Sequence, residues 1–546
     1  MNYFLLFITS LVTTLLLVPP IKKLAHVTGA IDEPCERKVH SGLVPRMGGL
    51  AIFFGFILTY FVYLNQSQEY RGILIGMVVV VLIGIIDDSI GLEPKLKLLG
   101  QVVAAMAAMV MSGVNINVLG GVLGSNFDLG MLSWPLTLLW IVGITNAINL
   151  SDGLDGLAGG ISLIAFSSFG FLAYYREDYF VFSLCLVLAG CILGFLKYNT
   201  HPAEIFMGDT GSLFLGYSLG TLSIAGNFKS LTTITLITPV LVLLIPIADT
   251  LWAIIRRLYE GRSPFSADKK HFHHTLLKTG MNHSQTVSVI YGLSTALSAC
   301  AVALALSSKL RYLLLPMVLM GVIALFAQVS GAVNFSHLTT RLFNKLDHWF
   351  SFESQSFLSK ASLRMLLIGT TIYSICFLVS LPLVPTNLLF IASTTVVLLL
   401  FLAATGGENG RSYMLFSLFF LAAAIALVIS HTIEADRRLL GVNMATLETI
   451  AFWFMVTGVF GKIIFKKTPE IVLSTPLEFF VFLVLISIAI VPEEFRSQYN
   501  LVHHTLRTFF LFLSFKIIAL TSFRKEHSTA SVILSSLVFV VFSTLL

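Results

Sequence analysis

Long apolar runs alternate with short polar loops along the whole chain. A helix that crosses a hydrocarbon core about 30 Å thick needs about 20 predominantly apolar residues, which is the length of most of these runs. The pattern therefore predicts roughly 18 membrane-spanning helices, with boundaries soft by a few residues. In chain order we expect them near residues 3–20, 47–64, 71–86, 96–113, 131–148, 157–174, 178–196, 211–228, 231–254, 284–305, 312–329, 363–382, 387–404, 412–430, 446–465, 474–491, 508–522 and 530–546.

Composition supports this prediction and excludes a soluble globular protein. Hydrophobic residues make up 56% of the 546-residue chain and charged residues only 11%, whereas soluble domains carry about 25% charged residues. The expected fold class is therefore all-α, in a polytopic integral membrane protein with about 11 of its spans in the first 330 residues. The net charge of +6 fits basic loops at a membrane surface and requires no nucleic-acid partner.

Basic residues place the polar loops on one side of the membrane. If residues 22–46 lie inside, the inside loops also include residues 87–97, 146–155, 197–209 and 256–278. That side then carries most of the lysine and arginine, as the positive-inside rule expects. The loops that combine carboxylates, amides, histidines and glycines all fall there, so the sequence predicts one site on the cytoplasmic face.

The chain divides by content into three parts. Residues 1–330 carry polar motifs at helix ends, and residues 331–362 are expected to form a cytoplasmic linker or an amphipathic helix at the inner interface. Residues 363–546 are expected to be additional membrane helices without an acid–amide cluster. Their function stays open between stabilisation, homodimer formation, lipid binding and recruitment of the next enzyme.

Two adjacent carboxylates, Asp87 and Asp88, end the apolar segment 73–86. A solvated helix end is the simplest explanation. However, an acid costs up to about 3 kcal/mol near the bilayer centre, and acids at such depths usually mark a site. Two neighbouring acids can share a proton or face one cation, and their repulsion raises one pKa, so one of them could serve as a base at neutral pH.

The stretch NAINLSDGLDGLAGG, residues 146–160, places an amide or an acid at every third position. These residues are Asn146, Asn149, Asp152 and Asp155. A helical turn would stack them on adjacent ridges, and the glycines between them would let the backbone approach a ligand closely. Oxygen ligands of this kind suit Mg²⁺ or Mn²⁺ and not zinc. A polar helix terminus without a ligand is the alternative.

The stretch IFMGDTGS, residues 205–212, sets Asp209 between two glycines just ahead of a span. Free N–H groups at that helix N-terminus would form a seat for a phosphate. The alternative is an ordinary N-terminal cap with Thr210 or Ser212. Phe206 could stack on a nucleobase, although a phenylalanine at the membrane interface needs no ligand to explain it.

The stretch RRLYEGRSPFSADKKHFHHTLL, residues 256–277, gathers arginines, lysines and three histidines in one inside loop. Its candidate ligand residues are Arg262, His271, His273 and His274. No cysteine or well-spaced carboxylate completes a tetrahedral zinc site, so a phosphate-binding cluster is favoured. An ordinary positive-inside loop would explain the arginines and lysines but not the histidines.

Acidic residues that bind a divalent cation, together with basic residues that bind phosphate, indicate a metal-dependent reaction on a diphosphate. A site at the inner leaflet implies a lipid acceptor. The motifs RKVHSGLVPRMGG, DDSIGLEPKLKLLGQ, NAINLSDGLDGLAGG, FMGDTGS and DKKHFHH resemble, in content and order, the polyprenyl-phosphate N-acetylhexosamine-1-phosphate transferases of glycosyltransferase family 4. The HFHH form is similar to the undecaprenyl-phosphate GlcNAc-1-phosphate transferase branch. The resemblance covers residues 1–320, and the C-terminal membrane region departs from it.

This resemblance implies transfer of an N-acetylhexosamine 1-phosphate, GlcNAc 1-phosphate in this branch, from a UDP-N-acetylhexosamine to undecaprenyl phosphate with release of UMP. The implied cofactor is Mg²⁺, with Mn²⁺ as a substitute. The reaction would initiate cell-surface polysaccharide synthesis at the cytoplasmic face of a bacterial inner membrane. Donors carrying MurNAc-pentapeptide, GalNAc, QuiNAc or FucNAc stay open, and a transporter of lipid or solute is a distant alternative.

The resemblance also implies functions for residues at matching positions. Asp209 would hold the metal and Asn149 would share it, while Asp87 and Asp88 would activate the lipid phosphate or bind the diphosphate. The catalytic candidates are therefore Asp87, Asp88, Lys97 and Asp209. Residues placed near the nucleoside are Asp152, Asp155 and Phe206. Residues placed near the phosphates are Lys97, His271, His273 and His274. Substrate-binding candidates added for their place in the same motifs are Asn146 and Arg262.

Overall fold

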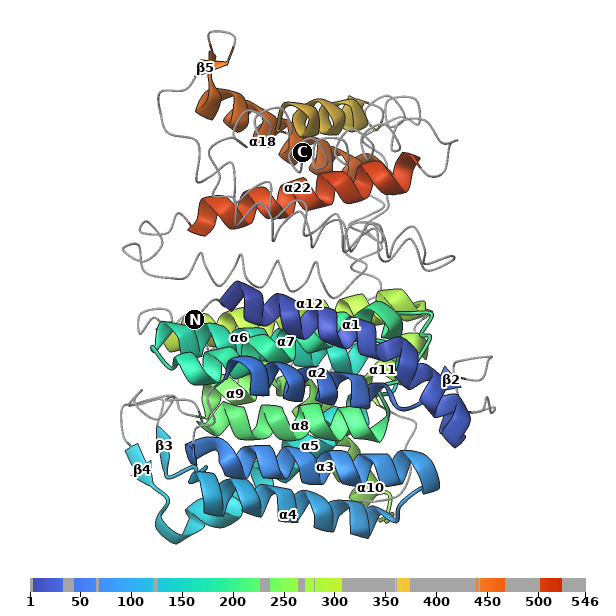
Figure 1. The fold of residues 1–546 in the computed structure, drawn as a ribbon, viewed down its shortest axis with the longest axis vertical. Coiled ribbons are helices and arrows are strands. Elements are labelled where there is room, and N and C mark those ends of the chain that lie inside the picture. The colour runs from blue at the N-terminus through green and yellow to red at the C-terminus, as the bar shows by residue number, and fades with distance from the viewer. Residues whose placement is uncertain are drawn as a thin grey trace. The chain divides into compact units, whose positions relative to one another are not determined.

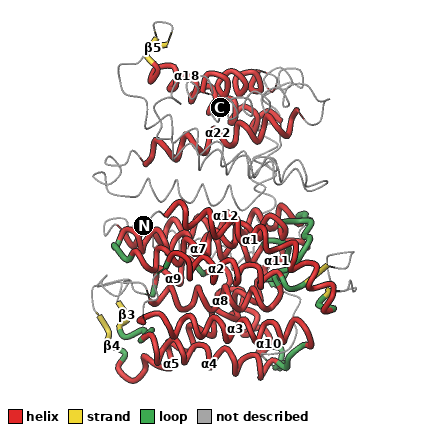
Figure 2. Tube along the Cα trace, viewed as in Figure 1, coloured by secondary structure: helices red, strands yellow, loops and turns green. Residues whose placement is uncertain are grey.

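The computed structural model describes residues 3–32, 44–64, 68–120, 126–225, 236–263, 271–278, 280–306, 359, 361–373, 438–439, 442–466 and 501–522. Helices dominate this part of the chain (Figure 2). Eight of the described helices are long and apolar enough to cross a membrane, which confirms the prediction of an all-α polytopic membrane protein. The chain forms two compact units, Met1–Val333 with Thr475–Ile490 and Asn334–Ser474 with Val491–Leu546.

The first unit contains twelve labelled helices among its described residues. They are α1 (Tyr3–Thr28), α2 (Gly48–Tyr63), α3 (Arg71–Ile90), α4 (Pro94–Ser112), α5 (Ser133–Ser151), α6 (Leu157–Tyr175), α7 (Tyr179–Asn199), α8 (Gly208–Ala225), α9 (Ile237–Val242), α10 (Leu244–Tyr259), α11 (Phe272–Lys278) and α12 (His283–Leu306). Short antiparallel ladders pair β1 (Ile31–Asp32) with β2 (Val44–Pro45) and β3 (Val118–Gly120) with β4 (Asn126–Asp128). Chain breakers set the α3–α4 connection, because α3 stops before Gly91, whose φ is 71°, and Pro94 opens α4.

Helix α8 is central to this unit and packs against α2, α3, α5 and α6 (Figure 1). Its residues from Thr210 to Ile224 are buried. It is not among the eight candidate spans, and many of its residues are glycine, serine or threonine. A helix surrounded by other helices needs small residues for close packing more than it needs apolar surface for lipid.

Glycines bring α2 and α3 against the first turn of α8. A Cβ built on Gly49 would lie 2.0 Å from the Gly211 nitrogen, and one on Gly84 would lie 2.3 Å from the Thr210 Cα. No side chain fits into such gaps, so only glycine permits these approaches. The position of Asp209, in this first turn, is therefore set by α2 and α3.

The prediction of one continuous span over residues 231–254 is wrong for the residues that the structure describes. They form α9 and α10, which are separated by a break at Leu243. Pro246 lies four residues after Val242. Proline has no backbone N–H to donate to the Val242 carbonyl, and its ring clashes with that carbonyl. The short helix α11, which the hydrophobic pattern did not predict, comes after α10 in the chain.

In the second unit, the described helices are Ala361–Tyr373, α18 (Met444–Lys466) and α22 (Leu501–Ser522), and β5 (Arg438–Leu439) pairs with β6 (Val442–Asn443) ahead of α18. The spans expected near 312–329, 387–404, 412–430, 474–491 and 530–546, and most of the linker expected over 331–362, lie outside the described residues.

The three described helices of the second unit share a buried polar cluster that was not predicted. Arg507 Nη1 lies 2.5 Å from Glu448 Oε1, which also accepts a hydrogen bond from the Tyr373 hydroxyl at 3.2 Å. The side chains of the ion pair are only 7% and 2% exposed. Loss of one partner of such a pair leaves a buried charge and costs about 3–5 kcal/mol, so the cluster holds these helices together.

We expect Gly49→Ala to destabilise the protein by about 1–3 kcal/mol, because the added methyl group would push α2 away from α8. Thermal unfolding of the detergent-purified protein would measure the change. The matched control is Gly143→Ala in α5, where nothing lies within 4 Å of an added Cβ. That variant should be neutral or more stable by up to about 1 kcal/mol through helix propensity. Equal midpoints for both variants would contradict the close approach of α2 and α8.

Candidate active site

Four helix ends meet at one place in the first unit. They carry Asp87 and Asp88 at the end of α3, Lys97 in the first turn of α4, Asn149 near the end of α5 and Asp209 in the first turn of α8. Hydrogen bonds and ion pairs connect the side chains of Asp87, Asn149 and Asp209, in part through Lys97, so the predicted gathering of these three residues is present.

The Lys97 ammonium lies between two carboxylates. Its Nζ is 3.2 Å from Asp87 Oδ2 and also contacts Asp209 Oδ2. The three side chains are between 14% and 20% exposed, so little water screens their attraction. One positive charge between two negative charges leaves a net negative site that favours a further cation.

Asn149 completes this cluster from α5. Its Nδ2 donates to Asp209 Oδ1 at 2.7 Å and to Ser212 Oγ at 2.8 Å. If the Asn149 amide is flipped, its Oδ1 takes the position of Nδ2 beside Asp209. Carboxylate and amide oxygens are the ligands that Mg²⁺ takes in proteins, so Asp209, Asn149 and Asp87 could hold this ion.

Asp88 has partners different from those of Asp87. Its Oδ1 accepts the Asp209 N–H at 2.8 Å, and its Oδ2 accepts the Thr210 N–H at 3.0 Å and the Thr210 hydroxyl at 2.7 Å. A helix start leaves such N–H groups without intrahelical partners. Gly208, with φ 70°, precedes them, and a Cβ there would lie 2.5 Å from Asp88 Oδ2. Asp88 therefore caps α8 from a neighbouring helix.

This cap corrects one sequence-based expectation. The Asp209 and Thr210 N–H groups were expected to bind a phosphate, and that is wrong because the Asp88 carboxylate already accepts their hydrogen bonds. Asp87 and Asp88 also have different partners, since Asp88 accepts hydrogen bonds from the start of α8 while Asp87 pairs with Lys97. The carboxylate that lies across Lys97 from Asp87 is Asp209.

The expected stack of four polar residues on adjacent helix ridges is also wrong. Asn146 and Asn149 lie on α5, but Asp152 caps its C-terminus and Asp155 lies in the α5–α6 turn, residues 152–156. The two glycines of this turn do not favour a continued helix. Asn146 exchanges amide hydrogen bonds of 2.5 and 3.3 Å with Gln101 and thereby ties α5 to α4.

Asp152 is half-buried at the end of α5, near the negative charges of Asp209 and Asp88. Burial, and then the negative charges of Asp209 and Asp88, raise the pKa of its carboxyl to about 7. The side chain can therefore change its protonation state near neutral pH.

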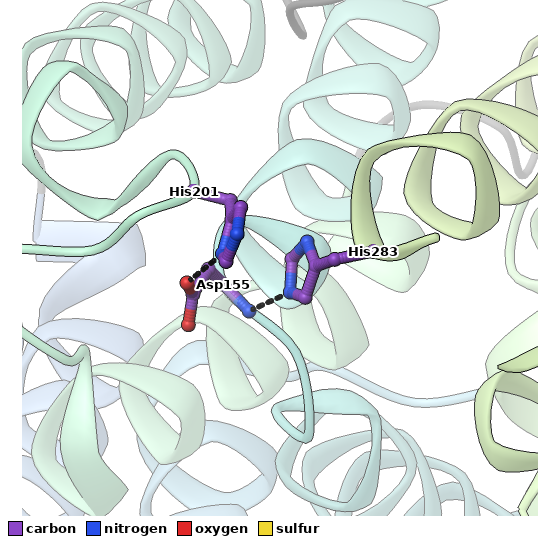
Figure 3. A group of neighbouring side chains, drawn as sticks. All are labelled: Asp155, His201 and His283. Atoms are coloured by element: carbon purple, nitrogen blue, oxygen red, sulfur yellow. Dashed lines mark hydrogen bonds and ion pairs between the residues drawn. The ribbon is translucent and has the colours of Figure 1, made fainter. Parts of the chain in front are cut away.

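Asp155 binds two histidines that the motif analysis did not single out (Figure 3). Its Oδ2 lies 2.7 Å from His201 Nδ1, and its backbone N–H donates to His283 Nε2 at 3.1 Å. The three residues offer metal-ligand atoms within 4.8 Å of one another. However, the imidazole rings stack, with centroids 4.1 Å apart and planes at 18°. Because ring lone pairs lie in the ring plane, nearly parallel rings cannot both aim at one ion. The trio is therefore a hydrogen-bonded unit.

The predicted histidine cluster adjoins the α5–α6 turn. His271 Nδ1 lies 3.1 Å from Asp249 Oδ2, and the backbone N–H after His271 donates to the other oxygen of Asp249 at 2.9 Å. His273 is 3% exposed, and a Cβ on Gly153 would lie 2.5 Å from its Nε2. Burial, and then the neighbouring His274, lower the pKa of His273 to about 3. His273 is thus neutral at pH 7 and adds no positive charge.

Phe206 and Arg262 lie in different settings. The Phe206 N–H donates to the Pro45 carbonyl at 2.8 Å, and its carbonyl accepts the Gly48 N–H at 2.9 Å, so its backbone is fixed against β2 and α2. Arg262 follows α10, is exposed and pairs with Glu260 at 3.2 Å. The lysines of the same motif, residues 269 and 270, lie outside the described residues.

Sequence reasoning missed several residues that hold the site together. They are Gln101, His201, Asp249 and His283. Asp249 could have been found, because an acid inside the apolar stretch LLIPIADTLWAI is a signal for a site. His201 and His283 could not, because their spacing from Asp155 carries no helical or metal-ligand pattern.

Comparison with known proteins points to the same part of the chain. The family model described as glycosyl transferase family 4 matches residues 70–227. The chain is 43% identical over 333 residues to the probable undecaprenyl-phosphate N-acetylglucosaminyl 1-phosphate transferase of Bacillus subtilis (strain 168), a match covering 60% of this chain and 92% of the relative.

Two further relatives match over a similar length. The decaprenyl-phosphate N-acetylglucosaminephosphotransferase of Mycobacterium tuberculosis (strain ATCC 25618 / H37Rv) is 38% identical over 316 residues, which cover 52% of this chain and 78% of the relative. The undecaprenyl-phosphate alpha-N-acetylglucosaminyl 1-phosphate transferase of Escherichia coli (strain K12) is 30% identical over 286 residues, which cover 51% and 77%. The similarity thus spans most of each relative and little more than half of this chain.

We expect Asp152→Asn to stabilise the protein increasingly as the pH rises from 5 to 7. The carboxyl has a pKa of about 3.9 in unfolded chains and about 7 in the fold. Between these values the folded state binds a proton that the unfolded state has lost, so wild-type stability falls with rising pH. An amide does not ionise, so the gain should grow up to pH 7 and then level off.

Thermal midpoints of wild type and variant at pH 5, 6, 7 and 8 would measure this trend. Asp128→Asn, at an exposed position in β4, is the matched control. A gain from Asp152→Asn that does not change with pH would contradict the raised pKa of this half-buried carboxyl.

Proposed function

Because this chain belongs to glycosyl transferase family 4, in the branch of the polyprenyl-phosphate N-acetylglucosamine-1-phosphate transferases, we propose that it transfers GlcNAc 1-phosphate from UDP-GlcNAc to undecaprenyl phosphate and releases UMP. The observation that carries the proposal is the cluster of Asp87, Lys97, Asn149 and Asp209 at the ends of membrane helices. We place the reaction at the cytoplasmic face of a bacterial inner membrane, as the first step of a cell-surface polysaccharide.

The surface beside this cluster suits a lipid acceptor. Apolar side chains are exposed on the neighbouring ends of α3 and α4, namely Ile86, Ile90, Leu96 and Leu99. In a bilayer these faces would contact acyl chains. A phosphate carried by a membrane lipid could therefore reach Asp87 and Lys97 without leaving the interface.

The proposed reaction has to bring two anions together. An oxygen of the lipid phosphate forms a bond to the β-phosphorus of the UDP-sugar, and the bond from that phosphorus to the UMP oxygen breaks. Lys97 supplies a fixed positive charge in a poorly hydrated place, where it stabilises developing negative charge more strongly than it would in water. Mg²⁺ held by Asp209 and Asn149 would neutralise the diphosphate oxygens when bound.

The two adjacent acids take different parts in this proposal. We assign Asp87 to the lipid phosphate, because its Oδ2 faces Lys97 within the cluster while its Oδ1 accepts the Leu92 N–H at 2.6 Å. A carboxylate there can remove the remaining proton from the lipid phosphate and so increase its nucleophilicity. Asp88 acts as a positioning residue, because its oxygens are engaged by the first turn of α8.

We expect the purified protein to release UMP when UDP-GlcNAc, undecaprenyl phosphate and Mg²⁺ are supplied. Asp209→Ala should lower turnover by at least about a hundredfold, because it removes the charge that holds the metal and pairs with Lys97. EDTA should abolish turnover, and Mg²⁺ or Mn²⁺ should restore it. Asp128→Ala, an exposed acid in β4, is the matched control and should keep wild-type turnover.

A panel of donors separates the remaining possibilities. UDP-GlcNAc would be compared with UDP-GalNAc, UDP-MurNAc-pentapeptide, UDP-QuiNAc and UDP-FucNAc under the same conditions. UMP release from another donor alone would replace the sugar but keep the reaction. Release of UDP or of free sugar would overturn phosphosugar transfer, and lipid movement without any nucleotide product would favour a transporter.

A further inference from the structure

The α5–α6 turn is held by side chains of other elements. The Asp155 N–H donates to His283 Nε2 at 3.1 Å, and the Gly156 N–H donates to Asn199 Oδ1 at 3.1 Å. The Tyr291 hydroxyl donates to the Gly156 carbonyl at 2.6 Å. Helix α12 thus supplies two of these bonds and the end of α7 supplies the third.

The side chain of Asp155 is fixed as well as its backbone. Its Oδ2 accepts the Ala203 N–H at 3.1 Å and lies 2.7 Å from His201 Nδ1. The His201 ring stacks on the His283 ring (Figure 3). Asp155 is 16% exposed and His201 43% exposed, so the pair lies at the edge of the protein where a soluble ligand could reach it.

These contacts determine the form of both imidazoles. A backbone N–H can only donate, so His283 Nε2 must be unprotonated to accept it. His201 Nδ1 faces a carboxylate oxygen, which accepts, so this nitrogen carries the hydrogen. His283 is therefore required as an acceptor and His201 as a donor.

The segments joined in this way lead directly to the two proposed metal ligands. The α5–α6 turn begins just after Asn149, at the end of α5, and the loop that contains Ala203 continues to Asp209 at the start of α8. If the diphosphate of a sugar nucleotide lies at these two residues, the turn and the loop are chain segments that adjoin it and could contact the rest of the molecule.

We propose that His201 and His283 are positioning residues that hold the α5–α6 turn as a binding wall for the nucleotide half of the donor. This proposal rests on the proposed function. The two histidines act through Asp155 and not on the reacting atoms at Asp87 and Lys97. Their loss should therefore weaken donor binding more than it slows the chemical step.

Paired variants test each histidine. His283→Leu removes the acceptor and should raise the KM and the Kd for UDP-GlcNAc about tenfold or more, because the Asp155 N–H loses its partner. His283→Gln, whose side-chain carbonyl can reach the position of Nε2, should bring both values to within about threefold of wild type. His201→Leu and His201→Asn form the equivalent pair, because asparagine can place an N–H where Nδ1 lies.

The measurement is a separation of binding from turnover. Steady-state UMP release gives kcat and the KM for each substrate, and titration calorimetry with UDP-GlcNAc gives the Kd without lipid. We expect kcat and the KM for undecaprenyl phosphate to change less than about threefold. His26→Leu, at an exposed histidine of α1, is the control and should match wild type. Should His283→Leu not fold, the exposed His201 pair provides the same comparison.

Three results would overturn the positioning proposal: unchanged donor KM and Kd in both leucine variants, a fall in kcat with donor KM unchanged, or leucine-like values in the glutamine and asparagine variants. Wild-type protein that binds UDP-GlcNAc but releases no UMP would overturn the proposed function alone, since the Kd comparison would still decide the positioning. Wild-type protein that does not bind UDP-GlcNAc would overturn both.

Discussion

The bond between the Asp88 carboxylate and the first turn of α8 is the interaction on which the site depends. A buried carboxylate is unfavourable unless it accepts hydrogen bonds, and a helix start leaves N–H groups without partners. Each group satisfies the other. Because Asp88 belongs to α3, the bond fixes the register between the helices that carry Asp87 and Asp209, and Gly84 and Gly208 allow the backbones to come close enough.

Once α3 and α8 are in register, the remaining contacts follow from charge. Asp87 and Asp209 would repel each other, and the Lys97 ammonium from α4 lies between them. Asn149 reaches Asp209 from α5, so four helices meet through side chains at their ends. An apolar helix that ends in two adjacent acids is thereby explained, because one acid assembles the scaffold and the other belongs to the reactive cluster that we propose.

Local pattern predicted the elements better than their partners. The run of apolar residues predicted α3 and α4, but it missed the break between α9 and α10, because one proline outweighs the hydropathy of its surroundings. The three-residue spacing from Asn146 to Asp155 suggested one helical face, yet the glycines end the helix before Asp152. The ion pair of Arg507 with Glu448 was also missed, because a charged residue in an apolar segment does not reveal which distant residue balances it.

The sequence by itself determined the class of the protein, the order of its helices and the residue types gathered at one set of helix ends. These properties follow from hydropathy, chain breakers and motif chemistry, which are local along the chain. Only the tertiary structure decided that Asp88 caps α8, that Lys97 lies between Asp87 and Asp209, and that His201 and His283 hold Asp155. The physical reason is that a hydrogen bond depends on distances of a few ångströms between helices, and glycine contacts and side-chain packing set those distances.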